Sequence, residues 1–413
     1  MKSGLGWLMA IAGCLLVLLP AACAREGAKS AVTVPIVLDH NRMTVEAEFQ
    51  RKDGSWRKAR LWVDTGNPDF FISEGLARDL GIDLSAAKPG ADGQIPALEI
   101  TPPAGVRIGG MPIDLTGIKS QVMSAVPWLF STTGSDANLP ATVLEKYQVV
   151  FDYPRLELTL APPGSLPHRG TRVPASVNPE TGIIQIDGSI GGDSLSLALD
   201  NGASYSYVSL GFLDRLSGRH PDWPRTTGAV GCANIWGWWP EESAWAVVRV
   251  PEMQLGAVHL AGVGLVGLPN FLPGGMDVGT WYSQKTARPV AGFLGPNAFK
   301  AFRLEFDYAG SAVYFEQGAE FDTTDMDLVG LTLRPEADGS YSVVGVAARG
   351  GQPAVQGVEA GDKLLQVGGL RAQGATMGKV VDALRGKPGE TRTLLIERAG
   401  KQLEVDAKVE RFL

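Results

Sequence analysis

Cysteine is scarce in this chain of 413 residues, which contains only Cys14, Cys23 and Cys232. The first two lie in an N-terminal segment that reads as an export signal, so Cys232 is the only cysteine certain to remain afterwards. A single cysteine cannot form an intramolecular disulfide, and the fold must therefore be stabilised by its hydrophobic core. Because no helix start or nearby histidine marks Cys232, we interpret it as a small buried hydrophobic residue.

Runs of Lys and Arg are also absent, and the net charge is −7. The sequence therefore gives no electrostatic footprint for nucleic acid, and we expect no nucleic-acid partner. No G-x-S-x-G nucleophile motif is present. The four histidines are scattered without the spacing of a zinc site, so we expect neither a metal nor a cofactor; they are His40, His168, His220 and His259.

One hydrophobic run stands out, at the N-terminus, where a mostly apolar stretch after Lys2 ends in "CLLVLLPAAC" and the charged "AREGAK" follows. Residues 1–23 have the layout of an export signal, and the apolar region is too short and ends too abruptly for a membrane span. Two outcomes remain open: Ala22-Cys23-Ala24 fits cleavage to a released protein, whereas "LPAAC" resembles a bacterial lipobox. We favour a lipidated Cys23, and hence an exported protein of the periplasm or cell envelope with a membrane anchor.

An internal repeat organises the rest of the chain. Residues 63–80, "VDTGNPDFFISEGLARDL", match residues 199–216, "LDNGASYSYVSLGFLDRL", so that Asp64 faces Asp200 and Gly66 faces Gly202. Two further blocks match in the same order, 106–115 with 253–262 and 138–160 with 293–315. Three matched blocks in one order indicate a duplication of about 140 residues.

Both copies place Asp-x-Gly in the same local context. The preceding segments "KARLWV" and "LSLAL" favour strands through their branched and aromatic residues. Glycine permits a sharp turn or a close approach that a side chain would forbid. Ser73 and Ser209 can each cap the short helix that the following apolar spacing predicts. The expected order is therefore strand, turn, strand and helix, twice.

At these residues the chain resembles an aspartic peptidase with two tandem lobes, each similar to one retroviral-type protease subunit. In that family each lobe contributes one Asp-Thr/Ser-Gly loop to a pseudo-twofold axis, and an apolar-apolar-Gly segment crosses behind the loop. The resemblance is carried by Asp64-Thr65-Gly66, Asp200-Asn201-Gly202, Phe293-Leu294-Gly295 and the two Phe-Asp-Tyr endings at Phe151 and Phe306. It implies a mainly β fold with two retropepsin-like lobes, over residues 31–163 and 164–322.

The resemblance also implies a chemistry, in which Asp64 and Asp200 are the catalytic pair. Two carboxyls held about 3 Å apart cannot both ionise, so they share one proton. The ionised member activates a water and the protonated member polarises the peptide carbonyl. Because the pair titrates as a unit, neither residue is assigned as acid or base from the sequence. The neighbours Thr65, Gly66, Asn201 and Gly202 are expected to support the two loops.

Two departures from the family pattern leave a second function open. Asn201 stands where the family has Thr or Ser, whose hydroxyl locks the loops across the axis. The Asn side chain can also donate and accept hydrogen bonds, but it places these groups at a different distance from the backbone than a hydroxyl does. Asn138-Leu139-Pro140 stands where apolar-apolar-Gly is expected, and proline fixes φ and removes a donor. The alternative to a peptidase is therefore a catalytically inactive peptide-binding or scaffold protein, since a fold alone does not carry function.

The segment "GCANIWGWWPEESAW" (231–245) is rich in tryptophan. A relative would place there the flap that closes over substrate, and Trp236, Trp238 and Trp239 could grip apolar side chains of a peptide. Alternatively, the tryptophans cover the core of the second lobe or pack against the next domain.

Residues 323–413 resemble a bacterial PDZ domain, mainly through "QPAVQGVEAGDKLLQVGGL" (352–370) and "ALRGKPGETRTLLIERAG" (383–400). The pattern predicts two strands, a short helix, a strand, a longer helix and two strands. PDZ domains bind peptide ends beside an edge strand, which we expect within 341–346. We thus expect an exported aspartic endopeptidase acting on a peptide or protein substrate, with an α+β PDZ domain that binds a peptide C-terminus and recruits or gates substrate.

Overall fold

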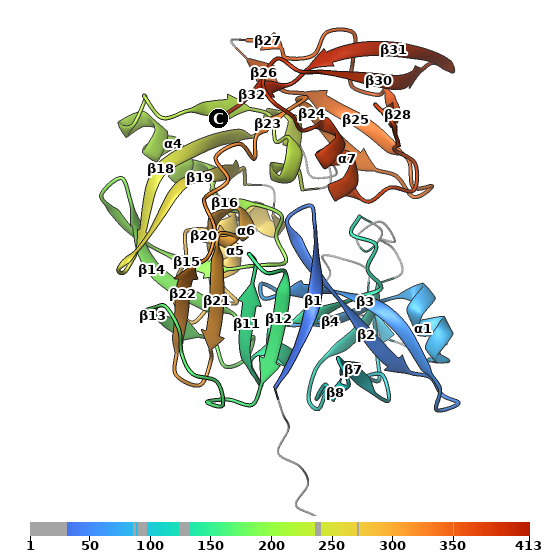
Figure 1. Cartoon of the computed structure of the whole chain (residues 1–413), viewed down its shortest axis with the longest axis vertical. Helices are drawn as coiled ribbons and strands as arrows, with labels where there is room; N and C mark the ends of the chain where they lie inside the picture. The colour runs from blue at the N-terminus through green and yellow to red at the C-terminus, as the bar shows by residue number, and fades with distance from the viewer. Residues whose placement is uncertain are drawn as a thin grey trace, which may run out of the picture.

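The computed structural model describes residues 31–85, 88–89, 97–123, 130, 132–235, 241–270, 272–349 and 351–413. Two β lobes lie side by side and a smaller C-terminal domain caps one end (Figure 1). The mainly β fold class is therefore confirmed. Within these ranges no helix is both long enough and apolar enough to cross a bilayer. The export signal and Cys23 lie outside the described residues, so their roles stay predictions.

Among its described residues, the first lobe is built of short strands and two short helices. In chain order these are β1 (Val32–Asp39), β2 (Arg42–Gln50), β3 (Trp56–Asp64), β4 (Phe70–Ser73), α1 (Glu74–Leu80), β5 (Lys88–Pro89), β6 (Ala97–Ile100), β7 (Val106–Ile108), β8 (Met111–Pro112), β9 (Ser120–Met123), β10 (Ala137–Pro140), α3 (Ala141–Leu144), β11 (Gln148–Asp152) and β12 (Glu157–Ala161).

Among the described residues, the second lobe repeats this order with a longer hairpin before its last strands. Its elements are β13 (Thr171–Val177), β14 (Ile184–Ile190), β15 (Asp193–Leu199), β16 (Ser206–Ser209), α4 (Leu210–Arg219), β17 (Arg225–Thr227), η1 (Gly231–Ala233), η2 (Glu242–Ala244), β18 (Ala246–Leu255), β19 (Val258–Leu268), η3 (Pro273–Gly275), α5 (Val278–Ser283), β20 (Gly292–Leu294), α6 (Pro296–Phe299), β21 (Phe302–Asp307) and β22 (Ala312–Gln317).

Strand pairing follows the sequence repeat. β10 runs parallel to β3, as β20 does to β15, and β4 runs parallel to β9, as β16 does to β19. Ser73 and Ser209 cap the two matched helices as expected, because each hydroxyl accepts a backbone N–H three residues on. The matched segments of the sequence therefore occupy matched positions in the fold.

A sheet shared by both lobes joins them. Its strands run in the order β1, β12, β11, β21, β22, β13, three from each lobe. The central pair β11 and β21 is antiparallel, and the rings of Phe151 and Phe306 meet there with centroids 5.0 Å apart. Since these residues belong to the two Phe-Asp-Tyr endings, the duplicated ends of the lobes meet at the pseudo-twofold axis.

In the described part of the C-terminal domain there are one main sheet and one helix. Its elements are β23 (Asp327–Leu328), β24 (Leu331–Pro335), β25 (Tyr341–Val346), β26 (Ala348–Arg349), β27 (Gln352–Pro353), β28 (Lys363–Val367), β29 (Leu370–Arg371), α7 (Met377–Leu384), β30 (Thr391–Arg398), β31 (Lys401–Lys408) and β32 (Glu410–Arg411).

Two expectations for this domain are wrong. The strand order β24, β25, β28, β30, β31 places β25 inside the sheet, so the edge strand is β24 and not residues 341–346. The short helix expected before β28 does not form in residues 354–360, where Gly357 has φ +82 and interrupts a helical path. The other predicted strands and the longer helix, α7, are present.

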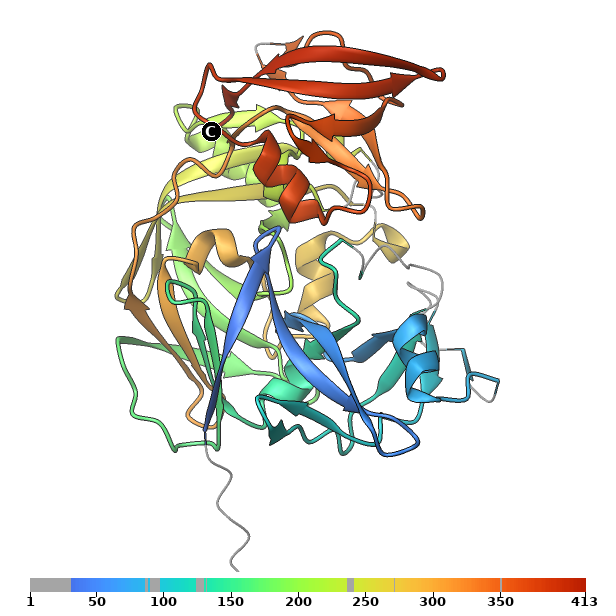
Figure 2. The same ribbon diagram turned by 45° about the vertical axis from the view of Figure 1, so that its right-hand side comes forward.

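The C-terminal domain is attached to both lobes. Figure 2 shows the β1–β2 hairpin of the first lobe reaching the start of α7, where the backbone N–H of Gly378 donates to Asp39 at 2.9 Å. The backbone N–H of Met377 donates to the Thr132 carbonyl at 2.8 Å. β26 adds to the sheet of the second lobe through β17. The domain therefore forms part of the same packed body as the lobes.

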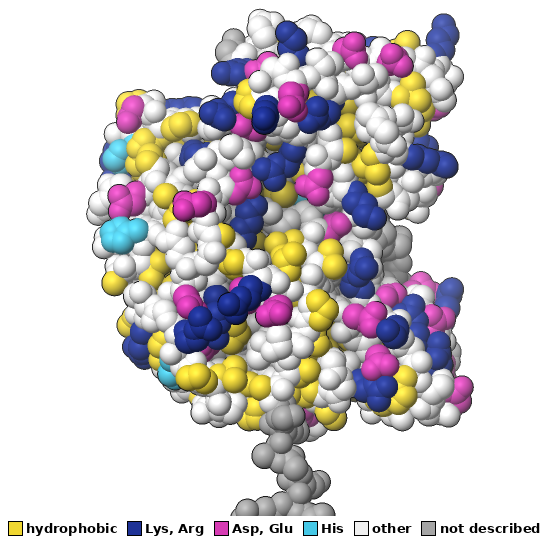
Figure 3. Space-filling model, in the orientation of Figure 1, with side chains coloured by type: hydrophobic (Ala, Val, Ile, Leu, Met, Phe, Trp, Pro, Cys, Tyr) yellow, Lys and Arg dark blue, Asp and Glu magenta, His cyan; other side chains and the backbone are white. Residues whose placement is uncertain are grey.

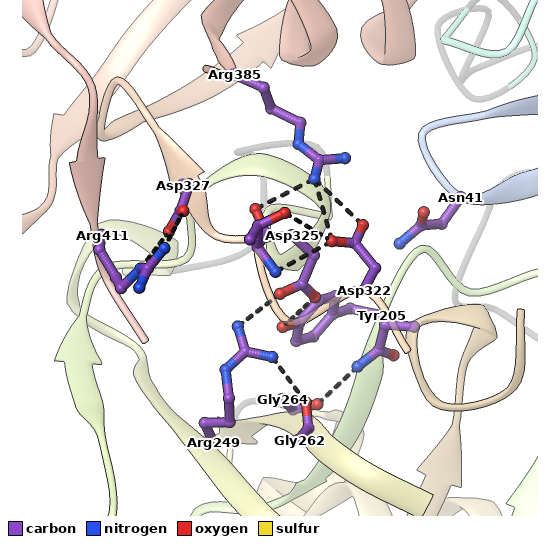
Figure 4. Close-up of polar contacts among 12 residues, drawn as sticks. Asn41, Tyr205, Arg249, Gly262, Gly264, Asp322, Asp325, Asp327, Arg385 and Arg411 are labelled. Atoms are coloured by element: carbon purple, nitrogen blue, oxygen red, sulfur yellow. Dashed lines mark hydrogen bonds and ion pairs between the residues drawn. The ribbon is translucent and has the colours of Figure 1, made fainter. Parts of the chain in front are cut away.

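Two ion pairs, one of them buried, fix the connection between the second lobe and the C-terminal domain (Figure 4). Asp325 accepts a hydrogen bond from Arg249 of β18 at 2.6 Å and another from the Tyr205 hydroxyl at 2.9 Å. Asp322 pairs with Arg385, just after α7, at 3.2 Å. Because both partners of the first pair are almost fully buried, this junction depends on the pair remaining complete.

Charges of both signs are interspersed over the face seen in Figure 3. The outline of the molecule is indented there between the C-terminal domain and the first lobe. This face therefore concentrates no field of one sign.

Candidate active site

The two Asp-x-Gly loops meet at the junction of the lobes. Asp64 is the last residue of β3 and Asp200 directly follows β15. Behind each loop runs the crossing strand, where Pro140 pairs with Asp64 and the Leu294 carbonyl accepts the Asp200 N–H at 2.9 Å. The structure thus brings together the two carboxyls that the sequence analysis paired.

Each carboxyl lies against the glycine of the other loop. A Cβ placed on Gly66 would be 2.2 Å from Cγ of Asp200, and one on Gly202 would be 2.3 Å from Oδ1 of Asp64. Each aspartate also accepts the N–H of its own loop glycine, at 3.1 Å for Asp64 and 2.9 Å for Asp200. Glycine is required at both positions because any side chain would displace a carboxyl.

Thr65 and Asn201 link the loops behind the carboxyls. The Thr65 hydroxyl accepts the backbone N–H of Asn201 at 3.0 Å, lies 2.9 Å from the Leu199 carbonyl and contacts Oδ1 of Asn201. Both side chains are buried. Asn201 therefore replaces the hydroxyl expected from the family pattern with an amide that still reaches across the axis.

Burial dominates the electrostatics of the pair. Asp64 is 6% exposed and Asp200 8% exposed. Desolvation, with the nearby Asp200 charge, raises the pKa of Asp64 to about 8. Desolvation also raises the pKa of Asp200, although hydrogen bonds from Tyr282 and from the loop backbone oppose the rise. One proton is therefore held by the pair near neutral pH.

A buried cation, the Arg42 guanidinium, lies next to the pair, and the sequence did not predict it. Nε of Arg42 donates to the Gly202 carbonyl at 2.9 Å, and its charge lowers the pKa of both aspartates. Its Nη1 lies 2.9 Å from Nδ1 of His40, whose Nε2 lies 3.1 Å from the Gly231 carbonyl. Burial, with the Arg42 charge, lowers the pKa of His40 to about 3, so this imidazole accepts from Arg42 in its neutral form.

Tyr282 of α5 is the second residue that sequence reasoning missed. Its hydroxyl lies 2.9 Å from Oδ2 of Asp200 and 3.0 Å from the Gly66 carbonyl. No motif marks it, because it lies in a segment of the second lobe that none of the matched blocks covers. Arg42 carries no signal either, since a lone Arg at the start of a strand is most often exposed.

The irregular crossing segment of the first lobe is accommodated by its own side chain. Asn138 accepts the Phe71 N–H at 2.6 Å and donates to the Asp69 carbonyl at 2.9 Å. Pro140 has φ −80, which its ring permits. In the second lobe a Cβ on Gly295 would lie 2.1 Å from the Tyr205 carbonyl, so glycine is required there. The departure at Asn138-Leu139-Pro140 thus leaves the crossing strand intact.

The residues predicted to form a flap lie outside the described part of the chain, which omits 236–240. After this segment, Trp245 is buried among residues of the second lobe and the C-terminal domain. Asn234 accepts the N–H of Leu333 in the edge strand β24 at 2.8 Å. Cys232 is a partly buried residue whose thiol pKa burial raises to about 12, which agrees with its interpretation as a packing residue.

This geometry supports acid–base chemistry by a carboxyl pair. Among the described residues no group of three or more His, Cys, Asp or Glu side chains could hold a metal ion. A surface hollow of about 750 Å³ lies between Gln50, Ile82 and Pro103, and neither aspartate lines it. Asp64, Asp200 and the groups that contact them supply acid–base chemistry at the lobe junction.

Comparisons with known proteins give little beyond this. No protein-family model matches the chain, and no curated protein sequence does. Among solved structures, the chain is similar to a retropepsin-like aspartic protease from Rickettsia conorii, with 22% identity and a TM-score of 0.25, over 32% of this chain and 90% of that one. The function is therefore inferred from the geometry of the site itself.

Proposed function

We propose that this protein is an aspartic-type endopeptidase that hydrolyses peptide bonds with a water activated between Asp64 and Asp200. The observation that carries the proposal is the contact of each carboxyl with the glycine of the opposite loop, inside a junction formed by two copies of one lobe. A paired, buried dyad of this kind has little structural purpose, because two carboxyls in one desolvated site are costly to bury.

The division of labour follows from the shared proton. The ionised carboxyl removes a proton from the water as the water oxygen bonds to the carbonyl carbon, and the protonated carboxyl donates to the carbonyl oxygen of the scissile bond. When the C–N bond then breaks, the first carboxyl gives its proton to the leaving amine and the second takes back a proton from the hydrated carbonyl, which restores the pair. Thr65 and Asn201 hold the loops, so the two carboxyls keep one relative position during the reaction. Both lobes lie on one chain, so the site needs no second copy.

The C-terminal domain belongs to this proposal as a PDZ-like module that gates or recruits peptide substrate. Its edge strand β24 is already contacted by the loop between β17 and β18, through Asn234 and through the Thr332 hydroxyl, which donates to the Ala229 carbonyl at 2.8 Å. This contact favours gating over recruitment, because a peptide that adds a strand to β24 must displace a loop of the second lobe.

Export and membrane anchoring complete the proposed function. A lipidated Cys23 would hold the enzyme at a membrane of the cell envelope, and the two lobes would act on peptides or proteins there. Labelling of the full chain with a radioactive fatty acid in a bacterial host, compared with a Cys23→Ala variant, tests this part separately.

The test of the activity is incubation of the mature chain with a mixed peptide library between pH 3 and 8. We expect endoproteolytic products from the wild type and none from Asp64→Asn or Asp200→Asn, while the surface variant Asp187→Asn keeps full activity. A wild type that binds peptides without cutting them at any pH would instead support the inactive peptide-binding protein. Cleavage that survives both dyad substitutions would refute the assignment.

A further inference from the structure

Among the described residues the hydrogen bonds of the dyad are not symmetric, and one residue of the second lobe makes the difference. Tyr282 lies on α5, whose start is capped by Asp277 through the Thr280 N–H. Its ring is 2% exposed and packs against Phe293 of the crossing strand with centroids 4.9 Å apart. The hydroxyl is therefore held rigidly at the junction of the two loops.

That hydroxyl contacts both lobes at once. It lies 3.0 Å from the carbonyl of Gly66 in the first loop and 2.9 Å from Oδ2 of Asp200 in the second. A phenol carries one hydrogen, so two arrangements are possible. Either Asp200 is ionised and accepts from Tyr282, or Asp200 carries the proton and donates to a hydroxyl that is turned toward Gly66.

The other donors decide between these arrangements. Oδ1 of Asp200 accepts the N–H of Gly202 at 2.9 Å and the N–H of Ala203 at 3.0 Å. The matching carboxyl, Asp64, accepts only the N–H of Gly66, at 3.1 Å, among the described residues. Hydrogen bonds from fixed donors favour the charged form of a carboxyl. With Tyr282 the count is three donors on Asp200 against one on Asp64.

We propose that Tyr282 is a positioning residue that keeps Asp200 as the ionised member of the pair and leaves the shared proton on Asp64. This inference rests on the proposed function for its catalytic meaning: Asp200 is the general base toward water, and Asp64 is the acid toward the carbonyl oxygen. The roles that the sequence leaves open are thus assigned by a residue outside the matched sequence blocks.

The surrounding charges do not create this difference. Arg42 of β2 lowers the pKa of both carboxyls, and Lys285, just after α5, lowers that of Asp64, which alone would favour ionisation of Asp64. His40 beside Arg42 is neutral. The Tyr153 phenol is also near the site, but burial raises its pKa, so it stays uncharged there. Among these groups, only Tyr282 donates to one carboxyl of the pair.

The test is a titration of the two carboxyls by NMR in the mature chain labelled with ¹³C at the aspartate carboxyls. Asp64→Asn and Asp200→Asn identify the two resonances and also report each carboxyl alone. We expect Asp200 to ionise at lower pH than Asp64, and Tyr282→Phe to raise the midpoint of Asp200 by roughly one pH unit. Tyr308→Phe is the matched control, since its buried hydroxyl has no hydrogen-bond partner in the described part of the chain, and it leaves both midpoints unchanged.

The kinetic counterpart separates this inference from the proposed function. The acidic limb of kcat/KM is expected to move to higher pH in Tyr282→Phe by the same amount, with the limb of Tyr308→Phe unchanged. If the wild type cleaves no peptide but the NMR midpoints behave as described, the peptidase proposal fails and the proton assignment stands. Ionisation of Asp64 before Asp200, in the wild type or in the single-carboxyl variants, overturns the inference, as does an unchanged or lowered Asp200 midpoint in Tyr282→Phe.

Discussion

Asn201 of the second lobe contacts Thr65 of the first, and the two residues close the dyad from behind. With Oδ1 of Asn201 oriented toward the Thr65 hydroxyl, two buried groups make no hydrogen bond among the described residues. They are Nδ2 of Asn201 and the Tyr153 hydroxyl. Burial raises the pKa of the Tyr153 phenol, and Asn201 is close enough to oppose part of this rise. Turning the amide by 180° satisfies both groups, because Nδ2 then donates to Thr65 and Oδ1 accepts from Tyr153.

This orientation makes a prediction about stability. Tyr153→Phe and Asn201→Ala should each destabilise the fold by about 1–3 kcal/mol, since each leaves the other residue unpaired. The double variant should lose less than the sum, with a coupling of at least about 0.5 kcal/mol in urea unfolding. Tyr308→Phe serves as the control, because its hydroxyl makes no hydrogen bond to any described residue. Strictly additive losses would show that Tyr153 and Asn201 do not interact.

The raised pKa of Asp64 predicts how stability changes with pH. The folded value is about 8 and the usual value 3.8, so the folded chain binds the extra proton between these limits. Stability contributed by this proton is complete below about pH 4 and is lost as the pH rises toward 8. In thermal unfolding experiments, the wild type should therefore lose stability relative to Asp64→Asn as the pH rises over this range.

A carboxyl with the opposite shift provides the control for that titration. Hydrogen bonds from the Thr116 backbone and hydroxyl lower the pKa of Asp114 to about 2. Its folded and unfolded values both lie below pH 5, so Asp114→Asn should give a flat difference between pH 5 and 8. A wild type that is stabilised relative to Asp64→Asn as the pH rises would contradict the proposed protonated state.

The buried pair at the domain junction predicts a large loss on substitution. Asp325→Asn leaves the Arg249 guanidinium buried without its counter-charge, because their side chains are only 4% and 9% exposed. We expect a loss of about 3–5 kcal/mol in the free energy of unfolding. The exposed pair of Arg288 with Asp187 is the comparison, and Asp187→Asn should cost about 0–1 kcal/mol. Equal losses at the two sites would show that the junction pair contributes no more to stability than an exposed pair does.

Occupation of the edge strand predicts a gain of binding. In Asn234→Ala the N–H of Leu333 loses its acceptor, so β24 becomes available to an added strand. Fluorescence anisotropy with a library of labelled hexapeptides ending in a free carboxylate should show tighter binding to this variant than to the wild type. Peptides amidated at the C-terminus distinguish recognition of the carboxylate from non-specific binding. Equal affinities would indicate that Asn234 does not block peptide binding at β24.

The sequence predicted those features that repeat or follow local rules. Asp64 and Asp200 could be paired because the duplication aligned them, and Ser73 and Ser209 followed helix-capping chemistry. The expected strand edge at 341–346 was wrong because alternation of residues shows which face is buried and not which neighbours pair.

The rest of the site depends on contacts between distant segments. Tyr282 reaches Asp200 across 82 positions in the chain, and Arg42 reaches Gly202 across 160. Neither residue belongs to a matched block, and neither has local spacing that marks a site. Only the closure of the two lobes brings them to the dyad, so their roles could be inferred from the structure alone.

The most direct test of the central claim compares the rates of peptide cleavage by four chains: the wild type, Asp64→Asn, Asp200→Asn and the double variant. If the two carboxyls act as one unit, each single substitution should lower kcat by roughly a thousandfold or more, and the double variant should be no slower than the singles. Independent losses that multiply in the double variant, or a single variant that keeps near wild-type activity, would contradict a shared catalytic pair.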